Sequence, residues 1–351
     1  MIANPWKPSS GRREPAELMK PVVDPAAWEV EDMARSQEWI YLLSDTENDE
    51  IERAVADVES QNLNVPQVGT AEFRLPTLAG PLADVKRELM HGRGFALLRG
   101  LRLDRMSKAQ ASIAFWGVGA YLGQAIPQNG KGHVLDHVKF MGGKASQDRG
   151  YTTNAELSFH CDSCDILGLG VVNTGKSGGE HRICSSVTLY NRMLAARPDL
   201  VKELGGMFYR HRSGDGYGGA KPWVVQRAFS FQDGYFTCRS AGGSILGAQR
   251  FPEVPRLTEK QKEALALFKT MADEQALVIP FRRGDAFWVM NHTMMHARTA
   301  YEDWPEPERK RHLMRLWLRN DMRPLPPEIL ETMGGPPLVA GAAPKAILEV
   351  A

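Results

Sequence analysis

Cysteine is scarce in this sequence of 351 residues, with only Cys161, Cys164, Cys184 and Cys238. The N-terminus has no apolar core of a secretion signal, so we expect reduced thiols in a cytoplasmic protein. No apolar run approaches the roughly 20 residues of a membrane helix, so no membrane association is expected. An excess of one charge is also absent. The 43 Lys and Arg and 42 Asp and Glu leave a net charge of +1, which gives no electrostatic footprint for nucleic acid.

A second pair of metal-binding residues is missing around the CxxC of Cys161 and Cys164. A structural zinc site needs four ligands, and a thioredoxin-like CxxC opens a helix, whereas this one lies among strand-forming residues. We therefore interpret the two cysteines as small residues buried beside a strand. We predict that they form neither a disulfide nor a metal site.

The residue pattern changes twice along the chain and predicts an α+β fold that is mainly β. Residues 1–65 are rich in Pro, Trp and charge and predict a helical extension packed on the core. Residues 66–325 carry many short strand signals, with a helical insertion at about 190–275. Residues 326–351 form a Pro- and Gly-rich tail that we expect to be loosely ordered. This pattern favours a jelly roll with flanking helices.

Several local signals predict individual elements. TAEFRLPTL (70–78) is strand-like, and GRGFALLRGL (92–101) indicates a buried strand that turns at Gly100. Ser107 is a candidate N-cap for the helix that follows it. The runs ALVIPF and AFWVMN, separated by the turn at 283–285, predict a hairpin.

His160-Cys161-Asp162 is an H-x-D motif. In a strand, alternate residues face the same side, so His160 and Asp162 are able to point at one metal ion. Two His and one carboxylate on one face of the metal, with open positions opposite, are typical of oxygen-activating non-haem iron enzymes. The alternative is an ordinary strand histidine, because a chain with nine His gives about one such match by accident.

A third ligand is sought in the segment NHTMMHAR, which follows a predicted strand. His296 is the candidate, brought close by the sheet, and His292 competes for this role. For His292 the simpler interpretation is a loop histidine that faces water.

The strand RHLMRLWLR carries arginine at alternate positions. With a period of two, one face holds Arg311, Leu313, Arg315, Trp317 and Arg319. Burying arginine is costly without an anionic partner, and its planar guanidinium pairs with a carboxylate in a bidentate manner. The strand therefore indicates an anion site, and the alternative is a solvated face of an edge strand.

Taken in this order, the H-x-D, the distant His and the following Arg residues resemble the taurine dioxygenase, clavaminate synthase and γ-butyrobetaine hydroxylase-like oxygenases. The resemblance runs from about Thr70 to Arg319. It includes GRGFALLRGL, YTTNAELSFHCDSCD, the SGGE turn, GDAFWVMN, NHTMMHART and RHLMRLWLR. The combination is far more specific than any one motif.

The resemblance implies a double-stranded β-helix that binds iron(II), 2-oxoglutarate and dioxygen. His160, Asp162 and His296 fall on the metal positions. Arg311 falls on the position that grips the distal carboxylate of 2-oxoglutarate, and Arg315 falls on one that touches a substrate anion in some relatives. The linker EDWPEPERK is longer than in the taurine enzyme, so the choice between the two arginines stays open.

Two further residues enter the candidate site through the same resemblance. His181 replaces a threonine that hydrogen-bonds the cosubstrate, so that contact is lost or changed. Asn154, in the motif that leads to His160, is a candidate substrate contact.

The implied function is a dioxygenase that oxidises an unactivated C–H bond of a small, carboxylate-bearing molecule by hydroxylation, desaturation or cyclisation. Succinate and carbon dioxide are the co-products. A homo-oligomer is compatible with the sequence. The alternatives are a metal-dependent hydrolase, for which Glu156 is the one candidate base, and a non-catalytic β-sandwich that holds an anion.

Overall fold

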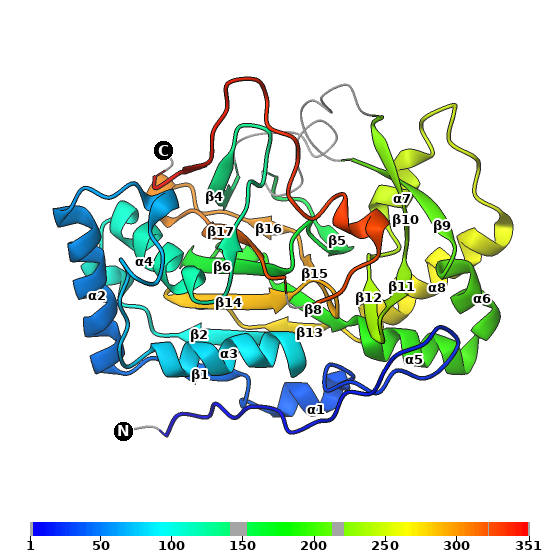
Figure 1. Ribbon diagram of the computed structural model, residues 1–351, viewed down its shortest axis with the longest axis horizontal. Helices are drawn as coiled ribbons and strands as arrows, with labels where there is room; N and C mark the ends of the chain where they lie inside the picture. The colour runs from blue at the N-terminus through cyan, green and yellow to red at the C-terminus, as the bar shows by residue number, and fades with distance from the viewer. Residues whose placement is uncertain (1–2, 141–152, 213–220, 322, 350–351) are drawn as a thin grey trace.

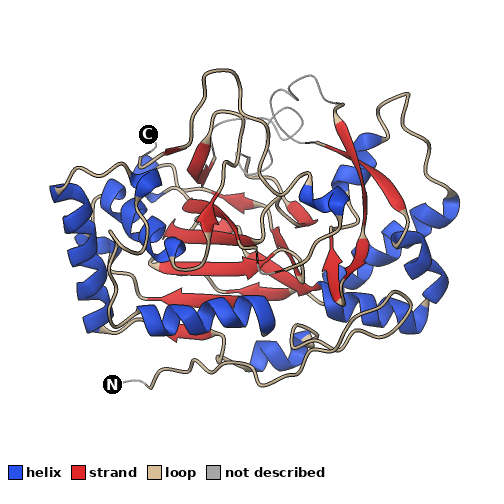
Figure 2. Cartoon of the chain, viewed as in Figure 1, coloured by secondary structure: helices blue, strands red, loops and turns tan. Residues whose placement is uncertain are grey.

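The computed structural model describes residues 3–140, 153–212, 221–321 and 323–349, and shows a mixed α/β fold with a sheet-rich core (Figures 1 and 2). The helices lie around this core. Their bounds are α1 Val30–Arg35, α2 Asp45–Ser60, α3 Ala79–His91, α4 Lys108–Ala120, α5 Ser186–Ala196, α6 Pro198–Leu204, α7 Gly243–Ala248, α8 Glu259–Glu274 and α9 Pro327–Leu330.

The larger sheet has the strand order β1-β2-β14-β6-β17-β4-β18, with β3 paired to β17. Neighbours are antiparallel except for the parallel pairs β1–β2 and β4–β18. The bounds are β1 Ile40–Leu42, β2 Phe95–Arg99, β3 Gln124–Ala125, β4 His133–Lys139, β6 Ile166–Asn173, β14 Asp285–Met290, β17 His312–Arg319 and β18 Lys345–Ala346.

The second sheet is antiparallel, with the order β13-β8-β15-β5. The described residues also form three separate strand pairs, β7–β16, β9–β10 and β11–β12. In the sequence, β9–β12 and the helices α5–α8 all fall between β8 and β13. The bounds are β5 Leu157–His160, β7 Ser177–Gly178, β8 His181–Ser185, β9 Met207–His211, β10 Trp223–Arg227, β11 Phe229–Gln232, β12 Tyr235–Cys238, β13 Leu277–Ile279, β15 Met294–Arg298 and β16 Tyr301–Glu302.

Alternation along the strands builds two hydrophobic layers. In β17, Met314, Leu316 and Leu318 pack with α2, α3 and α4 on one face of the larger sheet. Leu313 and Trp317 point the other way, into the cluster that also holds Ile183 and Ala297 of the second sheet. The ring of His181 on β8 lies 5.1 Å from that of Phe287 on β14, so side chains of the two sheets meet there.

Two of the local predictions are confirmed. GRGFALLRGL contains β2, and Gly100 after it has a φ of +101°, a value that favours glycine. Ser107 caps α4 with a capping box, because its hydroxyl accepts from the backbone of Gln110 and the Gln110 side chain accepts from the Ser107 backbone.

The strand predicted at 70–78 is wrong, because this segment forms turns. Phe73, Leu75 and Leu78 are buried as the pattern suggested. Their backbone is not paired with a strand. The carboxylate of Glu50 accepts hydrogen bonds from the amides of Thr77 and Leu78 instead, which replaces the ladder that a strand would need.

The hairpin predicted across 283–285 is also wrong, because β13 belongs to the second sheet and β14 to the larger one. The turn itself is present, with Gly284 at a φ of +83°. The buried carboxylate of Asp285 explains the different partner. It receives two hydrogen bonds from Arg99, at 2.9 and 2.8 Å, which join the start of β14 to the end of β2.

The tail after Pro326 is more ordered than predicted. Leu325, Ile329 and Met333 form a small buried cluster, and β18 adds a parallel strand beside β4. The extension at the other end of the chain also contributes a strand, β1, to the same sheet. No helix among the described residues is long and apolar enough to cross a membrane.

A pair of buried histidines joins this tail to the core. The Nε2 atom of His137 on β4 donates to the carbonyl of Ile347 at 2.8 Å, and its Nδ1 atom lies 2.7 Å from Nε2 of His312. Since only one of the two facing nitrogens can carry a hydrogen, the two rings cannot both be protonated, and the pair holds at most one positive charge. Burial lowers the pKa of both, that of His312 to about 3.

We predict that this pair makes the protein sensitive to acid. Below pH 6.5 these histidines bind protons in the unfolded chain but not in the folded protein, because folding lowers their pKa. The free energy of unfolding therefore falls as pH drops from about 6.5 towards 4. His312 alone contributes up to about 1.4 kcal/mol per pH unit in that window, because its folded pKa of about 3 lies below the window. Urea unfolding at pH 7 and pH 5 measures this loss, and His312→Gln should reduce it. An equal loss in the variant and the wild type would contradict the assignment.

Candidate metal centre

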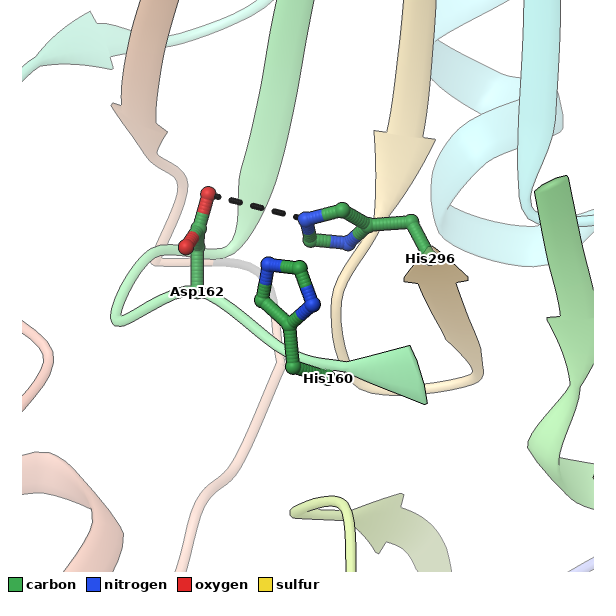
Figure 3. Close-up of side chains that lie close together, drawn as sticks. All are labelled: His160, Asp162 and His296. Atoms are coloured by element: carbon green, nitrogen blue, oxygen red, sulfur yellow. Dashed lines mark ion pairs between the residues drawn. The ribbon is translucent and has the colours of Figure 1, made fainter. Parts of the chain in front are cut away.

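His160 and His296 are neighbours across two strands (Figure 3). His160 is the last residue of β5, and His296 is the central residue of β15, directly opposite it in the register. Their ring centroids lie 4.1 Å apart. The Nδ1 atom of His160 donates to the carbonyl of Ser158 at 2.8 Å, which fixes the ring and leaves Nε2 as the ligand atom.

Asp162 lies beyond the end of β5, not within the strand as the H-x-D pattern suggested. Three contacts hold it. Its amide donates to the Oδ1 atom of Asn291 at 3.2 Å, its carbonyl accepts from NH1 of Arg239 at 2.9 Å, and its Oδ2 atom accepts from the indole of Trp317 at 2.9 Å. The carboxylate is thus aimed at the two histidines by contacts and not by strand alternation.

The local charges match the ligand forms of these residues. Burial, helped by His160 and Arg315 and opposed by Asp162, lowers the pKa of His296 to about 3, so its ring is neutral. Burial alone would raise the pKa of Asp162, but His296, Arg315 and His160 bring it below its usual value. Two neutral imidazoles and one carboxylate are the protonation states that a metal ion requires.

In the described ranges, the ligand atoms of His160, Asp162 and His296 are close enough to bind one metal ion. No other group of three or more His, Cys, Asp or Glu side chains in these ranges meets this condition. These ligand atoms lie within 4.8 Å of one another, and Nε2 of His296 is 3.8 Å from Oδ2 of Asp162. The sequence-predicted trio is therefore brought together. The donor set, two imidazole nitrogens and one carboxylate oxygen, suits iron(II).

The competitor, His292, has a different place. It is fully buried, and its Nε2 atom lies 2.6 Å from Oδ1 of Asp165. The interpretation as a water-facing loop histidine is wrong for this reason. The pair also explains why His292 is separate from the metal group, since its ring is already bonded to a carboxylate of the core.

A cavity of about 370 Å³ lies between the two sheets and is lined in part by His181, Phe281, Arg311 and Leu313. Arg311 immediately precedes β17, and burial lowers its pKa to about 10. Its NH1 atom and the Nε2 atom of His181 are buried without a hydrogen-bond partner among the described residues. Buried unpaired donors are expensive, so this pair of donors fits an anionic ligand of the cavity.

Arg315, four residues along β17, reaches a different part of the site. Its Nε atom donates to the side chain of Gln128 at 2.6 Å, and its guanidinium lies 5.3 Å from the ring of Trp317. Asn154 is exposed, and its side chain donates to the carbonyl of Tyr301 at 3.4 Å. Its role as a substrate contact stays a prediction.

Sequence reasoning missed the residues that hold Asp162 in place, which are Trp317, Asn291 and Arg239. Trp317 lies on the strand face that was predicted to carry the arginines, so the alternation contained a signal for it. Arg239 follows the distant hairpin β11–β12, and no pattern linked it to His160 or Asp162.

The cysteines of the CxxC are free thiols, and Cys164 is buried whereas Cys161 is only partly buried. The sulfur of Cys161 lies near the carbonyls of Cys238 and Met294, while Cys164 accepts from the amide of Asn291 at 3.0 Å. Burial raises the pKa of both thiols.

Two curated proteins are similar to the chain over most of its length. One is FR-33289 synthase of Streptomyces rubellomurinus, which is 29% identical over 316 residues, or 86% of this chain and 91% of the relative. The other is the taurine hydroxylase-like protein SAT17 of Stachybotrys chartarum, 26% identical over 310 residues, or 85% and 80% of the two chains.

Solved structures of non-haem iron oxygenases share the fold. Asparagine oxygenase in complex with Fe(II), hydroxyasparagine and succinate superposes with a TM-score of 0.63 at 17% identity, over 80% of this chain and 93% of its own. OrfP in complex with Fe and α-ketoglutaric acid gives 0.62 at 14% identity, over 86% and 100%. The model of the taurine catabolism dioxygenase TauD, TfdA family matches residues 60–317, and the chain belongs to this family.

Proposed function

We propose that the chain is an iron(II)- and 2-oxoglutarate-dependent dioxygenase that oxidises a C–H bond of a small, carboxylate-bearing molecule. The observation that carries this proposal is the convergence of His160, Asp162 and His296, whose ligand atoms lie within 4.8 Å of one another. Membership of the TauD, TfdA family supports it. The double-stranded β-helix of such enzymes is the proposed topology of residues 66–325, with 1–65 as an extension and 326–351 as a tail.

Iron(II), 2-oxoglutarate and dioxygen together supply the oxidation, in which 2-oxoglutarate gives succinate and carbon dioxide while the substrate C–H bond is oxidised. The protein binds the reactants, orients the C–H bond and excludes water. Arg311 would receive the distal carboxylate of 2-oxoglutarate, because a buried guanidinium with a free donor suits a carboxylate. His181 would donate its Nε2 hydrogen to the same cosubstrate.

Aromatic rings enclose this end of the site. His181 is stacked on Phe281, with centroids 5.0 Å apart, and meets the edge of Phe287 at 5.1 Å. Burial keeps the pKa of His181 well below its usual value, so the ring is a neutral donor. Because these rings exclude water and lower the local dielectric constant, each charge-assisted hydrogen bond to the cosubstrate is stronger.

The hydrolase alternative is less well supported by the site. Its one candidate base, Glu156, is exposed and pairs with Arg182 at 2.9 Å, so it is neither buried nor free. The anion-binding alternative leaves unexplained why two imidazoles and a carboxylate converge where no anion would bind.

The proposal is tested by succinate release. Purified protein with iron(II), 2-oxoglutarate and dioxygen is screened against small acids and amino-acid derivatives, and succinate is measured by mass spectrometry. We expect release that depends on all three reactants and is stimulated by at least one substrate. Release that is unchanged without iron, or none with any compound, would contradict the proposal.

A further inference from the structure

Buried arginines are unusually poor in acidic partners around this site. Within the described ranges, Arg210, Arg239 and Arg311 are 7% exposed or less, yet none of their guanidinium groups has a carboxylate within 4.0 Å. Arg93, buried elsewhere, shows the usual solution, an ion pair with Glu88 at 2.6 Å. A buried charge without a counterion is costly, so an anion from outside the chain would stabilise these arginines.

Arg311 is accounted for by the cosubstrate, but Arg239 is not. Arg239 follows β12 and is 7% exposed. Its guanidinium makes one hydrogen bond to a described residue, from NH1 to the carbonyl of Asp162 at 2.9 Å. Its Nε and NH2 atoms have no hydrogen-bond partner in the described part of the chain. A cationic group with spare donors therefore lies beside the metal trio, on the side of the β11–β12 hairpin.

The surroundings fix Arg239 in this place. Arg210 donates from NH1 to the carbonyl of Ser240 at 2.6 Å and from NH2 to that of Arg239 at 2.5 Å. The Ser240 hydroxyl donates to the carbonyl of Phe159 at 2.8 Å, and the amide of Cys238 donates to the carbonyl of His292. The segment 238–240 is thereby attached to both chain segments that carry the metal trio, so the guanidinium of Arg239 is preorganised.

Resting on the proposed function, we infer that Arg239 binds an oxyanion of the primary substrate, with Arg210 as its positioning residue. The group is a carboxylate or a tetrahedral phosphonate or sulfonate, since the planar guanidinium donates two parallel hydrogen bonds to any of them. The β11–β12 hairpin then selects substrates, because it brings Arg239 to the metal trio. The cosubstrate carboxylate is held separately by Arg311.

The test uses the full chain under anaerobic conditions, loaded with iron(II) and 2-oxoglutarate so that the Arg311 cavity is filled. Methylphosphonate, methanesulfonate and acetate are titrated by calorimetry into wild type, Arg239→Gln and Arg239→Lys. Arg250→Gln is the matched control, since Arg250 is an exposed arginine of the same insertion. We expect at least one anion to bind wild type and the control with equal affinity. The same anion should bind Arg239→Gln about tenfold or more weakly, and its affinity for Arg239→Lys should lie in between.

Binding that is equal in wild type and Arg239→Gln, or absent in wild type with every anion, overturns the inference. If the Gln variant does not fold, as judged by circular dichroism, unchanged affinity in the Lys variant overturns it. The same titrations on metal-free protein separate the two proposals. Suppose that metal-free protein binds an anion through Arg239 but the protein shows no iron-dependent succinate release. The proposed function would then be contradicted, while the anion site would be supported.

Discussion

Replacing His296 with alanine should abolish succinate release and weaken iron(II) binding by about 100-fold or more. His296 is the ligand from the second strand, and even changes in the residues that only orient metal ligands cost about 10- to 100-fold. Its neutral ring faces the Asp162 carboxylate at 3.8 Å, so alanine removes one of three donors and leaves the other two without the cross-strand partner. Iron retained after equilibrium dialysis, together with succinate by mass spectrometry, measures the effect.

His292→Gln is the matched control, because His292 lies four residues earlier and is also buried. Glutamine keeps a donor for the Asp165 carboxylate, which would otherwise be buried with one partner fewer. We expect normal iron content and most of the turnover. Loss of iron in the His292 variant, with iron kept in the His296 variant, would refute the ligand assignment.

Arg311→Ala should weaken 2-oxoglutarate binding by about two orders of magnitude or more. Losing one partner of a buried charge pair costs roughly 3–5 kcal/mol. The free NH1 atom of Arg311 lines the cavity that His181 also lines, so the distal carboxylate would have no cationic partner there after the change. Anaerobic calorimetry of 2-oxoglutarate against iron-loaded protein measures the loss.

Arg315→Ala is the comparison for this variant, since Arg315 is a second buried arginine, four residues further along and within β17. Its guanidinium is bonded to Gln128 and lowers the pKa of Asp162, so its loss should affect the metal trio and the primary substrate more than the cosubstrate. If Arg315→Ala loses 2-oxoglutarate and Arg311→Ala does not, the roles of the two arginines are reversed. If neither does, this strand does not bind the cosubstrate.

The convergence of His160, Asp162 and His296 was predictable because the signals for these residues are close together or come in a fixed order along the chain. His160 and Asp162 are two residues apart, and His296 follows a predicted strand and precedes the arginine-rich segment in the sequence. Alternation also placed Leu313 and Trp317 on one face of β17 and Met314 on the other. The two faces of β17 depend on a period of two, which the sequence displays directly.

Other features depend on long-range contacts that no period reveals. Glu50 turned the apolar segment 70–78 away from a strand by capping its amides, and Asp285 joined β14 to β2 and not to β13. Arg239 reaches Asp162 from a point 77 residues away in the sequence. The tail looked loosely ordered because its Pro and Gly content hid the pairing of β18 with β4.

The most direct test of the central claim is the visible absorption spectrum of anaerobic protein titrated first with iron(II) and then with 2-oxoglutarate. We expect a weak visible charge-transfer band that needs both additions, saturates at about one equivalent of iron and is missing in His296→Ala. No band in the wild type, or an equal band in His296→Ala, would contradict the assignment of His160, Asp162 and His296 as the centre of an iron(II)- and 2-oxoglutarate-dependent enzyme.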